Sequence, residues 1–172
     1  LLSGPFLARI DAQVEFDFDT SEPPVGIPSD DFSVRWTGSF FAPSGGTYEF
    51  GVLHDDGARL FVNGQLILDE WGPSGGDFDT ATVDLLGGRW YFLELHYYEA
   101  SGGARVELHW APPGDVMDPM QPSELRPIYD RNGDSVPDAC QMLDCNGNGV
   151  ADGDELAAGT QTDCNGDGVL DS

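Results

Sequence analysis

Apolar and polar residues alternate along several segments in the first two thirds of this chain, and short glycine-rich turns separate the segments. Val34, Trp36 and Phe40 alternate with polar neighbours, and the same pattern recurs at 48–52 and 105–110. Because successive side chains of a strand point to opposite faces, a period of two predicts strands with one buried face. No helical period is sustained in this region. The alternation therefore predicts an all-β fold, an antiparallel β-sandwich or jelly-roll-like barrel.

Glycine pairs mark the turns between the predicted strands. Asp56-Gly57 and Asn63-Gly64 are the strongest hairpin signals, because these residues tolerate a positive φ. Further turns are predicted at Ser44-Gly45-Gly46, Gly87-Gly88 and Gly102-Gly103.

Composition divides the chain into three parts. Every aromatic residue except Tyr129 lies in residues 1–114, whereas residues 129–172 are acidic and nearly devoid of apolar side chains. Prolines are frequent between these parts, which favours an extended linker. We predict a sandwich over 1–114, a proline-rich linker over 115–128 and a small acidic appendix over 129–172.

The charge balance excludes several classes of partner. The chain has 31 Asp and Glu against 7 basic residues, all Arg, for a formal net charge of −24. Binding to nucleic acid or to an anionic membrane surface requires clustered cations, so neither is expected. Apolar runs are also too short for a membrane span, and membrane insertion is not expected.

Three in-phase repeats fill the acidic segment, beginning at Asp130, Asp144 and Asp163. Each places oxygen donors at positions 1, 3, 5, 7 and 9, the pattern of an EF-hand calcium loop. The middle repeat also has Gly149 at position 6 and Glu155 at position 12, whereas the first has Ser135 at position 6. The predicted Ca²⁺ ligands are Asp130, Asn132, Asp134, Val136, Asp138, Asp144, Asn146, Asn148, Val150, Asp152, Glu155, Asp163, Asn165, Asp167, Val169 and Asp171.

Residues 1–114 resemble the PA-14 domain family, named after anthrax protective antigen. The resemblance is carried by the RWTG strand at 35–38, the DDGARL segment at 55–60 and the aromatic strand at 89–98. It implies a β-sandwich, and also a first strand that would precede residue 1. In lectin-like members two adjacent aspartates joined by a cis peptide bind Ca²⁺, and the ion holds sugar hydroxyls. The matching residues are Asp55 and Asp56, although Asp56-Gly57 also reads as an ordinary hairpin turn.

The second loop of the lectin-like site departs from the family pattern. Family members supply an asparagine there, whereas this loop reads Glu99-Ala100-Ser101-Gly102-Gly103. The resemblance therefore makes Glu99 and Ser101 the candidate replacements for the asparagine. Trp71 is a candidate for stacking on a sugar ring, or alternatively it covers the end of the sandwich.

The acidic segment resembles thrombospondin type-3 or dockerin-like calcium repeats more than a regulatory EF-hand pair. Pairing position 11 of one repeat with position 2 of the next predicts a Cys140–Cys145 disulfide, with the partner of Cys164 beyond the chain. Disulfides and weak calcium loops are typical of the extracellular space. We therefore expect a secreted or cell-surface protein.

Nothing in the sequence predicts catalysis. The segment Gly133-Asp134-Ser135-Val136 superficially resembles a lipase nucleophile block, but it lies inside a predicted calcium loop. The predicted function is calcium-dependent adhesion, or binding to a glycan or cell-surface polysaccharide. Two alternatives remain open: a structural subunit that assembles head to tail into an extracellular fibre or stalk, and an accessory domain of a larger glycosidase.

Overall fold

The computed structural model describes residue 7 and residues 9–18 and 26–127, which form β-strands joined by turns. No helix in this part of the chain is long and apolar enough to cross a membrane. The strands are β1 (Glu15–Asp17), β2 (Phe32–Ala42), β3 (Gly46–Asp55), β4 (Gly57–Val62), β5 (Gln65–Glu70), β6 (Asp77–Leu85), β7 (Arg89–Glu99), β8 (Arg105–Ala111), β9 (Asp118–Pro119) and β10 (Leu125–Pro127). The all-β prediction is confirmed.

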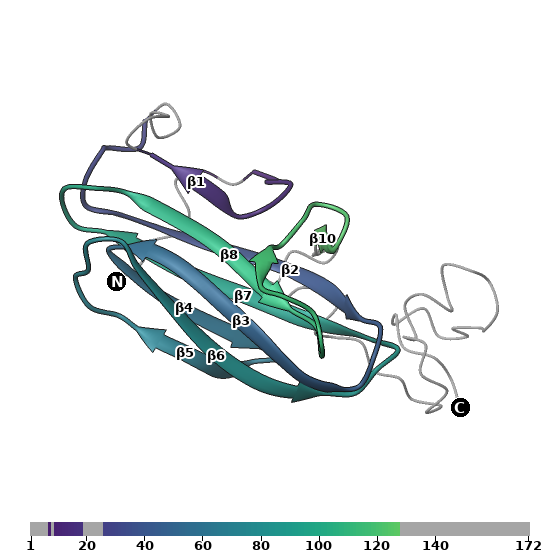
Figure 1. Cartoon of the computed structure of the whole chain (residues 1–172). Coiled ribbons are helices and arrows are strands. Elements are labelled where there is room, and N and C mark those ends of the chain that lie inside the picture. Colours follow the sequence, from purple (N-terminus) through teal and green to yellow (C-terminus); the bar gives the residue numbers. More distant parts are fainter. Residues whose placement is uncertain (1–6, 8, 19–25, 128–172) are drawn as a thin grey trace, which may run out of the picture. The chain divides into compact units, whose positions relative to one another are not determined.

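Two antiparallel sheets make up the sandwich (Figure 1). The first has the strand order β1-β8-β3-β6, with β9 also paired to β8, and the second has the order β10-β2-β7-β4-β5. The longest pairing joins β2 to β7 over their whole length, from Phe32 opposite Glu99 to Ala42 opposite Arg89.

Aromatic and branched side chains from the inner faces of both sheets form the core. Tyr48, Phe50 and Val52 on β3 are fully buried, as the period-two pattern predicts. Phe40 from the opposite sheet meets Phe50 and Trp110, with ring centroids 5.4 and 5.6 Å away. Such edge-on aromatic contacts hold the two sheets together and make the strand ends rigid supports for the loops.

The two predicted hairpin turns differ in outcome. Asn63 and Gly64 have φ values of 48° and 74° and join the paired strands β4 and β5, so this hairpin is confirmed. The prediction of a hairpin at Asp56-Gly57 is wrong. Strand β3 pairs in the first sheet and β4 in the second, so the chain crosses between the sheets at this point.

The sandwich extends beyond the boundary predicted at residue 114. Strand β9 pairs with β8, strand β10 pairs with β2, and Met120 between them is 1% exposed. The segment 115–127 therefore belongs to the folded unit that ends at Pro127 and is not an extended linker. Proline could not reveal this difference, because it is tolerated at sheet edges as well as in linkers.

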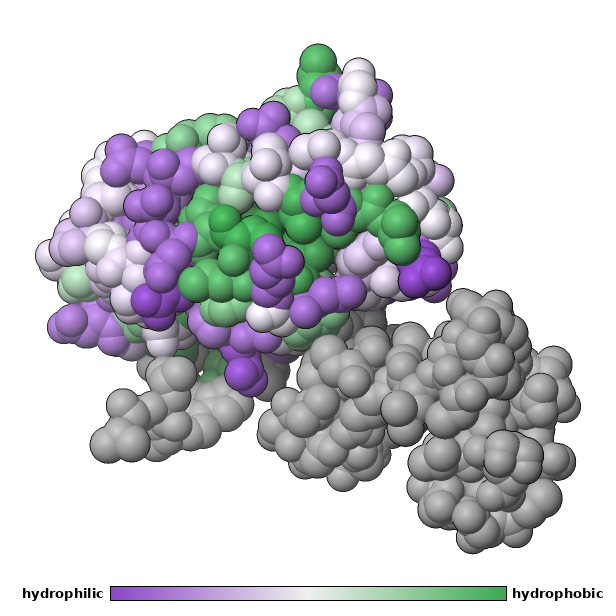
Figure 2. All heavy atoms as spheres, turned by 90° about the horizontal axis from the view of Figure 1, so that it is seen from below, coloured by the Kyte–Doolittle hydropathy of each residue, from purple (hydrophilic) through white to green (hydrophobic). Residues whose placement is uncertain are grey.

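Apolar residues gather on the face seen in Figure 2, surrounded by hydrophilic ones. Strands β5 and β6, the lowest in Figure 1, form the free edges of the two sheets on this side. Each carries an exposed apolar side chain, Leu66 at 43% and Phe78 at 46%. Phe78 lies across Gly51, where an added Cβ would come within 2.5 Å of its ring.

Candidate functional site

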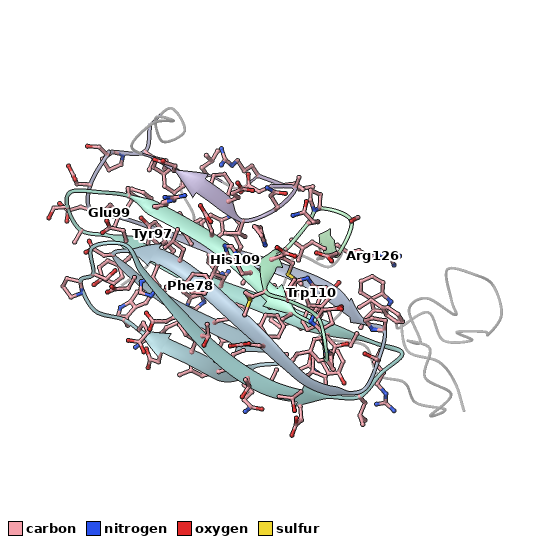
Figure 3. The ribbon with its side chains drawn as sticks, viewed as in Figure 1. Phe78, Tyr97, Glu99, His109, Trp110 and Arg126 are labelled. Atoms are coloured by element: carbon pink, nitrogen blue, oxygen red, sulfur yellow. The ribbon has the colours of Figure 1, made fainter. Side chains whose placement is uncertain are left out.

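Three carboxylates meet at one end of the sandwich. Asp55 ends β3, Asp56 links β3 to β4, and Glu99 ends β7. One oxygen from each lies within 4.8 Å of the others. Tyr97 and Glu99 lie at this end of the sandwich in Figure 3, whereas Trp110 and Arg126 lie towards the opposite end.

Asp56 connects the loops around the cluster. Its peptide bond to Asp55 is cis, as the family resemblance implies, and its side chain is 4% exposed. Oδ2 accepts a hydrogen bond from the backbone N–H of Ala100 at 2.8 Å, and Oδ1 accepts one from the N–H of Ser74 at 3.2 Å. The Asp56 carboxylate therefore fixes the 71–76 and 100–104 loops relative to β3.

His54 and Ser74 support the backbone beneath the cluster. The imidazole Nδ1 of His54 donates to the carbonyl of Asp56 at 2.5 Å, and Nε2 lies 3.1 Å from a carboxylate oxygen of Asp79. The Ser74 hydroxyl lies 2.9 Å from the carbonyl oxygen of His54 and 2.8 Å from that of Asp56. These contacts set the direction in which the aspartate pair leaves β3.

Glu99 is 1% exposed, which is unusual for a carboxylate. Oε2 accepts a hydrogen bond from the Tyr97 hydroxyl at 3.3 Å, and this hydroxyl also donates to the carbonyl of Asp55. Oε1 has no hydrogen-bond partner among the described residues. Burial, followed by the negative charge of Asp56, raises the pKa of Glu99 to about 7. Burial and the charge of Glu99 also raise the pKa of Tyr97, which keeps its hydroxyl protonated as a donor.

An aromatic rim, formed by Arg59, Trp71 and Tyr98, lies beside the cluster. Trp71 is 40% exposed, its ring lies 4.7 Å from that of Tyr98, and the Arg59 guanidinium lies 4.8 Å from its centroid. Tyr98 packs over Gly57, directly after Asp56, where an added Cβ would lie 2.3 Å from the ring. Glycine at position 57 therefore allows Tyr98 to pack directly on the segment that follows Asp56.

The donor set fits a hard divalent cation. Ca²⁺ prefers oxygen ligands, and clustered carboxylates supply both donors and charge. Carboxylates that are buried this close together repel one another unless a cation or proton accompanies them. Glu99, which contributes one oxygen to the cluster, also has an oxygen, Oε1, without a hydrogen-bond partner among the described residues.

The structure brings together Asp55, Asp56 and Glu99 from the predicted sandwich site. The side chain of Ser101 is exposed, and only its N–H, 3.5 Å from Asp56 Oδ2, is near the cluster. Trp71 lies in the aromatic rim, linked to the aspartates through Tyr98 and Gly57. The predicted calcium ligands at 130–171 and the Cys140–Cys145 disulfide lie outside the described residues.

Sequence reasoning missed the residues that support the cluster, namely His54, Ser74, Tyr97 and Tyr98. His54 was the one of these residues that the sequence could have indicated. It directly precedes the aspartate pair, so it must lie at the same end of the strand as the aspartates. Ser74 lies 18 residues from Asp56 in an ordinary glycine-rich loop, and no local pattern distinguished it.

Comparison with known proteins agrees with the fold. A model of the PA14 domain family matches residues 2–124. The chain belongs to the PA14 domain family. Anti-sigma-I factor RsgI3 of Acetivibrio thermocellus is 32% identical over 119 residues, which cover 69% of this chain and 18% of that protein.

Two solved structures extend the comparison. An anti-sigma factor domain-containing protein has a TM-score of 0.66 and 32% identity, over 72% of this chain and 43% of that one. A PA14 sugar-binding domain from an RTX adhesin has a TM-score of 0.51 and 27% identity, over 57% of this chain and 55% of that one. The chain therefore spans less than two thirds of each of these relatives.

Proposed function

We propose that this chain is a non-catalytic, calcium-dependent carbohydrate-binding module of a secreted or cell-surface protein, with Asp55 and Asp56 at its glycan site. The observation that carries this proposal is the convergence of three carboxylates beside an exposed tryptophan at a loop end of the sandwich. Bound calcium would supply the positive charge that attracts pairs of sugar hydroxyls. The protein's part is to hold the oxygen donors at one point.

The aspartate pair is built for a fixed donor geometry. Backbone N–H groups of two loops hold the Asp56 carboxylate, and one of its oxygens lies within 4.8 Å of oxygens of Asp55 and Glu99. Asp55 is only partly buried, so the cluster is reachable from solvent on its side. Partial access is what a metal site needs when the metal also binds a ligand.

The aromatic rim supports a sugar ring beside the ion. Pyranose rings present C–H faces that pack on aromatic side chains, and Trp71 offers a partly exposed ring. Arg59 fixes Trp71 by a cation–π contact and is itself held by Asp69, 2.6 Å from its Nε. The RTX adhesin domain, described as sugar-binding, is consistent with this use of the fold.

We further propose that the acidic segment binds calcium through its three repeats and that Cys140 pairs with Cys145. Segments of this composition cannot fold on a core of their own, so metal binding would supply their folding energy. Loops with such ligand sets in extracellular modules bind Ca²⁺ with Kd values of roughly 10⁻⁴–10⁻³ M. Extracellular calcium fills such loops, which is why a secreted or cell-surface location fits them.

A glycan-array screen of the full chain tests the function, run in calcium and in EDTA. Wild type is compared with Asp55→Ala and with Asp115→Ala, which removes an exposed carboxylate from the loop after β8. We expect glycan binding that disappears in EDTA and in Asp55→Ala but persists in Asp115→Ala. Calcium-dependent stability without any glycan bound would refute the proposal and favour a structural subunit of a fibre or stalk.

A further inference from the structure

Glu99 is a buried carboxylate whose bonding is incomplete. It is 1% exposed, its Oε1 has no hydrogen-bond partner among the described residues, and its Oε2 has one bond at 3.3 Å. An ionised carboxylate in this setting is strongly disfavoured unless a cation accompanies it. Folded proteins rarely leave such a group unsatisfied, so an isolated orphan oxygen points to a ligand.

The acidic neighbours of Glu99 make the need for a cation greater. An oxygen of Glu99 lies within 4.8 Å of oxygens of Asp55 and Asp56, and the Asp30 carboxylate approaches the same loop through the N–H of Gly102 at 3.2 Å. At this separation like charges repel strongly in a partly desolvated site.

The arginines near the cluster are engaged elsewhere. Arg105 lies opposite Asp55 in the pairing of β3 with β8, and its guanidinium binds Glu107 at 2.6 Å. Arg59 binds Asp69 at 2.6 Å. Each positive charge is therefore matched by a carboxylate of its own.

We propose that Glu99 is a third carboxylate ligand of the calcium ion, and that its charge restricts the module to neutral glycans. This inference rests on the proposed function, because it concerns the same site. A neutral amide in place of Glu99 would leave a divalent ion balanced by two aspartates. With Glu99, the three negative charges of the carboxylates exceed the two positive charges of the ion. The calcium-bound site therefore keeps a net negative charge.

The excess negative charge decides which sugars fit. A neutral sugar contributes two hydroxyl oxygens to the ion and adds no charge. A uronate would bring a carboxylate to a loaded site that is already negative, beside arginines that are already paired. Neutral glycans with adjacent hydroxyls are therefore favoured over polyuronates.

The proposal that Glu99 binds calcium is tested by measuring the unfolding temperature of the sandwich as the concentration of free calcium is raised. All four tryptophans lie within the sandwich, so tryptophan fluorescence of the full chain reports this unit alone. A ligand that binds only the folded state raises the unfolding temperature once its concentration passes the Kd. The calcium concentration at which that rise begins measures the affinity of the sandwich site.

Glu99→Gln keeps the shape and removes the charge, and Glu99→Asp keeps the charge on a shorter side chain. Glu49→Gln, on an exposed position of β3, is the matched control. We expect Glu99→Gln to need about 10–100-fold more calcium, at least the loss seen when a metal ligand's supporting partner is removed. Glu99→Asp should fall between, and Glu49→Gln should match wild type. A Glu99→Gln curve that superimposes on wild type would overturn the assignment.

The proposed selectivity for neutral glycans is tested by comparing the binding of neutral oligosaccharides with that of oligouronates of equal length, at a buffered, saturating calcium concentration. Wild type should bind neutral sugars only, and Glu99→Gln, with its site filled, should gain uronate binding. A Glu99→Gln protein that still rejects uronates would overturn the role of the Glu99 charge. Uronate binding by wild type that requires calcium and Asp55 would overturn the selectivity while supporting the proposed function. Absence of all glycan binding would refute the proposed function, and the calcium titration would still decide the role of Glu99.

Discussion

Replacing Asp56 by alanine should destabilise the sandwich even when no metal is present. The Asp56 carboxylate receives backbone N–H groups from Ala100 at 2.8 Å and from Ser74 at 3.2 Å. Both donors belong to loops that carry site residues. Alanine removes the acceptor and leaves the two N–H groups without their partner.

The size of the effect follows from two opposing contributions. Hydrogen bonds to a charged acceptor contribute about 1.5–3 kcal/mol each, so two contribute roughly 3–6 kcal/mol. Removing a buried charge beside Asp55 and Glu99 relieves repulsion and offsets about 1–2 kcal/mol of that loss. We expect a net loss of about 2–4 kcal/mol, or a Tm lower by roughly 5–20 °C for a domain of this size.

The assay is thermal unfolding in EDTA followed by tryptophan fluorescence, with Asp115→Ala as the surface control. The control should stay within about 0.5 kcal/mol of wild type. In saturating calcium the gap between wild type and Asp56→Ala should widen, by about 2.7 kcal/mol when calcium is at 100 times the Kd. An Asp56→Ala protein as stable as wild type in EDTA would show that the loops do not depend on this carboxylate.

Three further results are expected. In EDTA the pKa of Glu99 is about 7 in the folded protein, above its ordinary value of about 4.5, so the folded state holds the proton more tightly than the unfolded state does. Its stabilising contribution is present below pH 4.5 and lost as the pH rises through 7, so Glu99→Gln should gain about 2–3 kcal/mol on wild type between pH 5 and 8 in urea titrations. Thiol titration of the denatured, unreduced monomer should find one free thiol if Cys140 pairs with Cys145 and Cys164 is free, and three thiols would contradict the disulfide. Asp144→Ala should lower the calcium stoichiometry in calorimetry while leaving tryptophan-detected unfolding in EDTA unchanged, and an unaltered stoichiometry would count against the middle loop.

The strands could be predicted because their information is local. Alternation at 48–52 and the Asn63-Gly64 turn each specify a conformation within a few residues, and the structure confirms both. Asp56-Gly57 has an equally strong local signal, yet there the chain changes sheets. Which sheet a strand joins depends on partners far along the chain, such as β7 for β4, and local pattern does not encode them.

The candidate site shows the same division between local and distant information. The aspartate pair was recognisable because its residues are adjacent, and Glu99 because the family pattern places a ligand in its loop. Tyr97 lies two residues from Glu99 on the same face of β7, but the proximity of Glu99 to Asp55 and Asp56 arises only when the distant β3–β4 crossing packs beside the end of β7. Ser74 and Ala100 act through backbone groups, which every residue but proline provides, so no residue type could mark them.

The contacts of Asp56 fix the position of the two loops without depending on which side chains the loops carry. Its carboxylate accepts hydrogen bonds from the main-chain N–H groups of Ser74 and Ala100. The side chains of Trp71 and of residues 100–103 take no part in those two bonds. New side chains can therefore be introduced at 71, 100 and 101 without shifting the carboxylates of the cluster, whereas Gly102 has a φ of 107° that other residues rarely adopt. Such a framework suits diversification: a library varied at 71, 100 and 101, with Asp55, Asp56, Ser74 and Gly102 kept, would sample new ligands on a constant anchor.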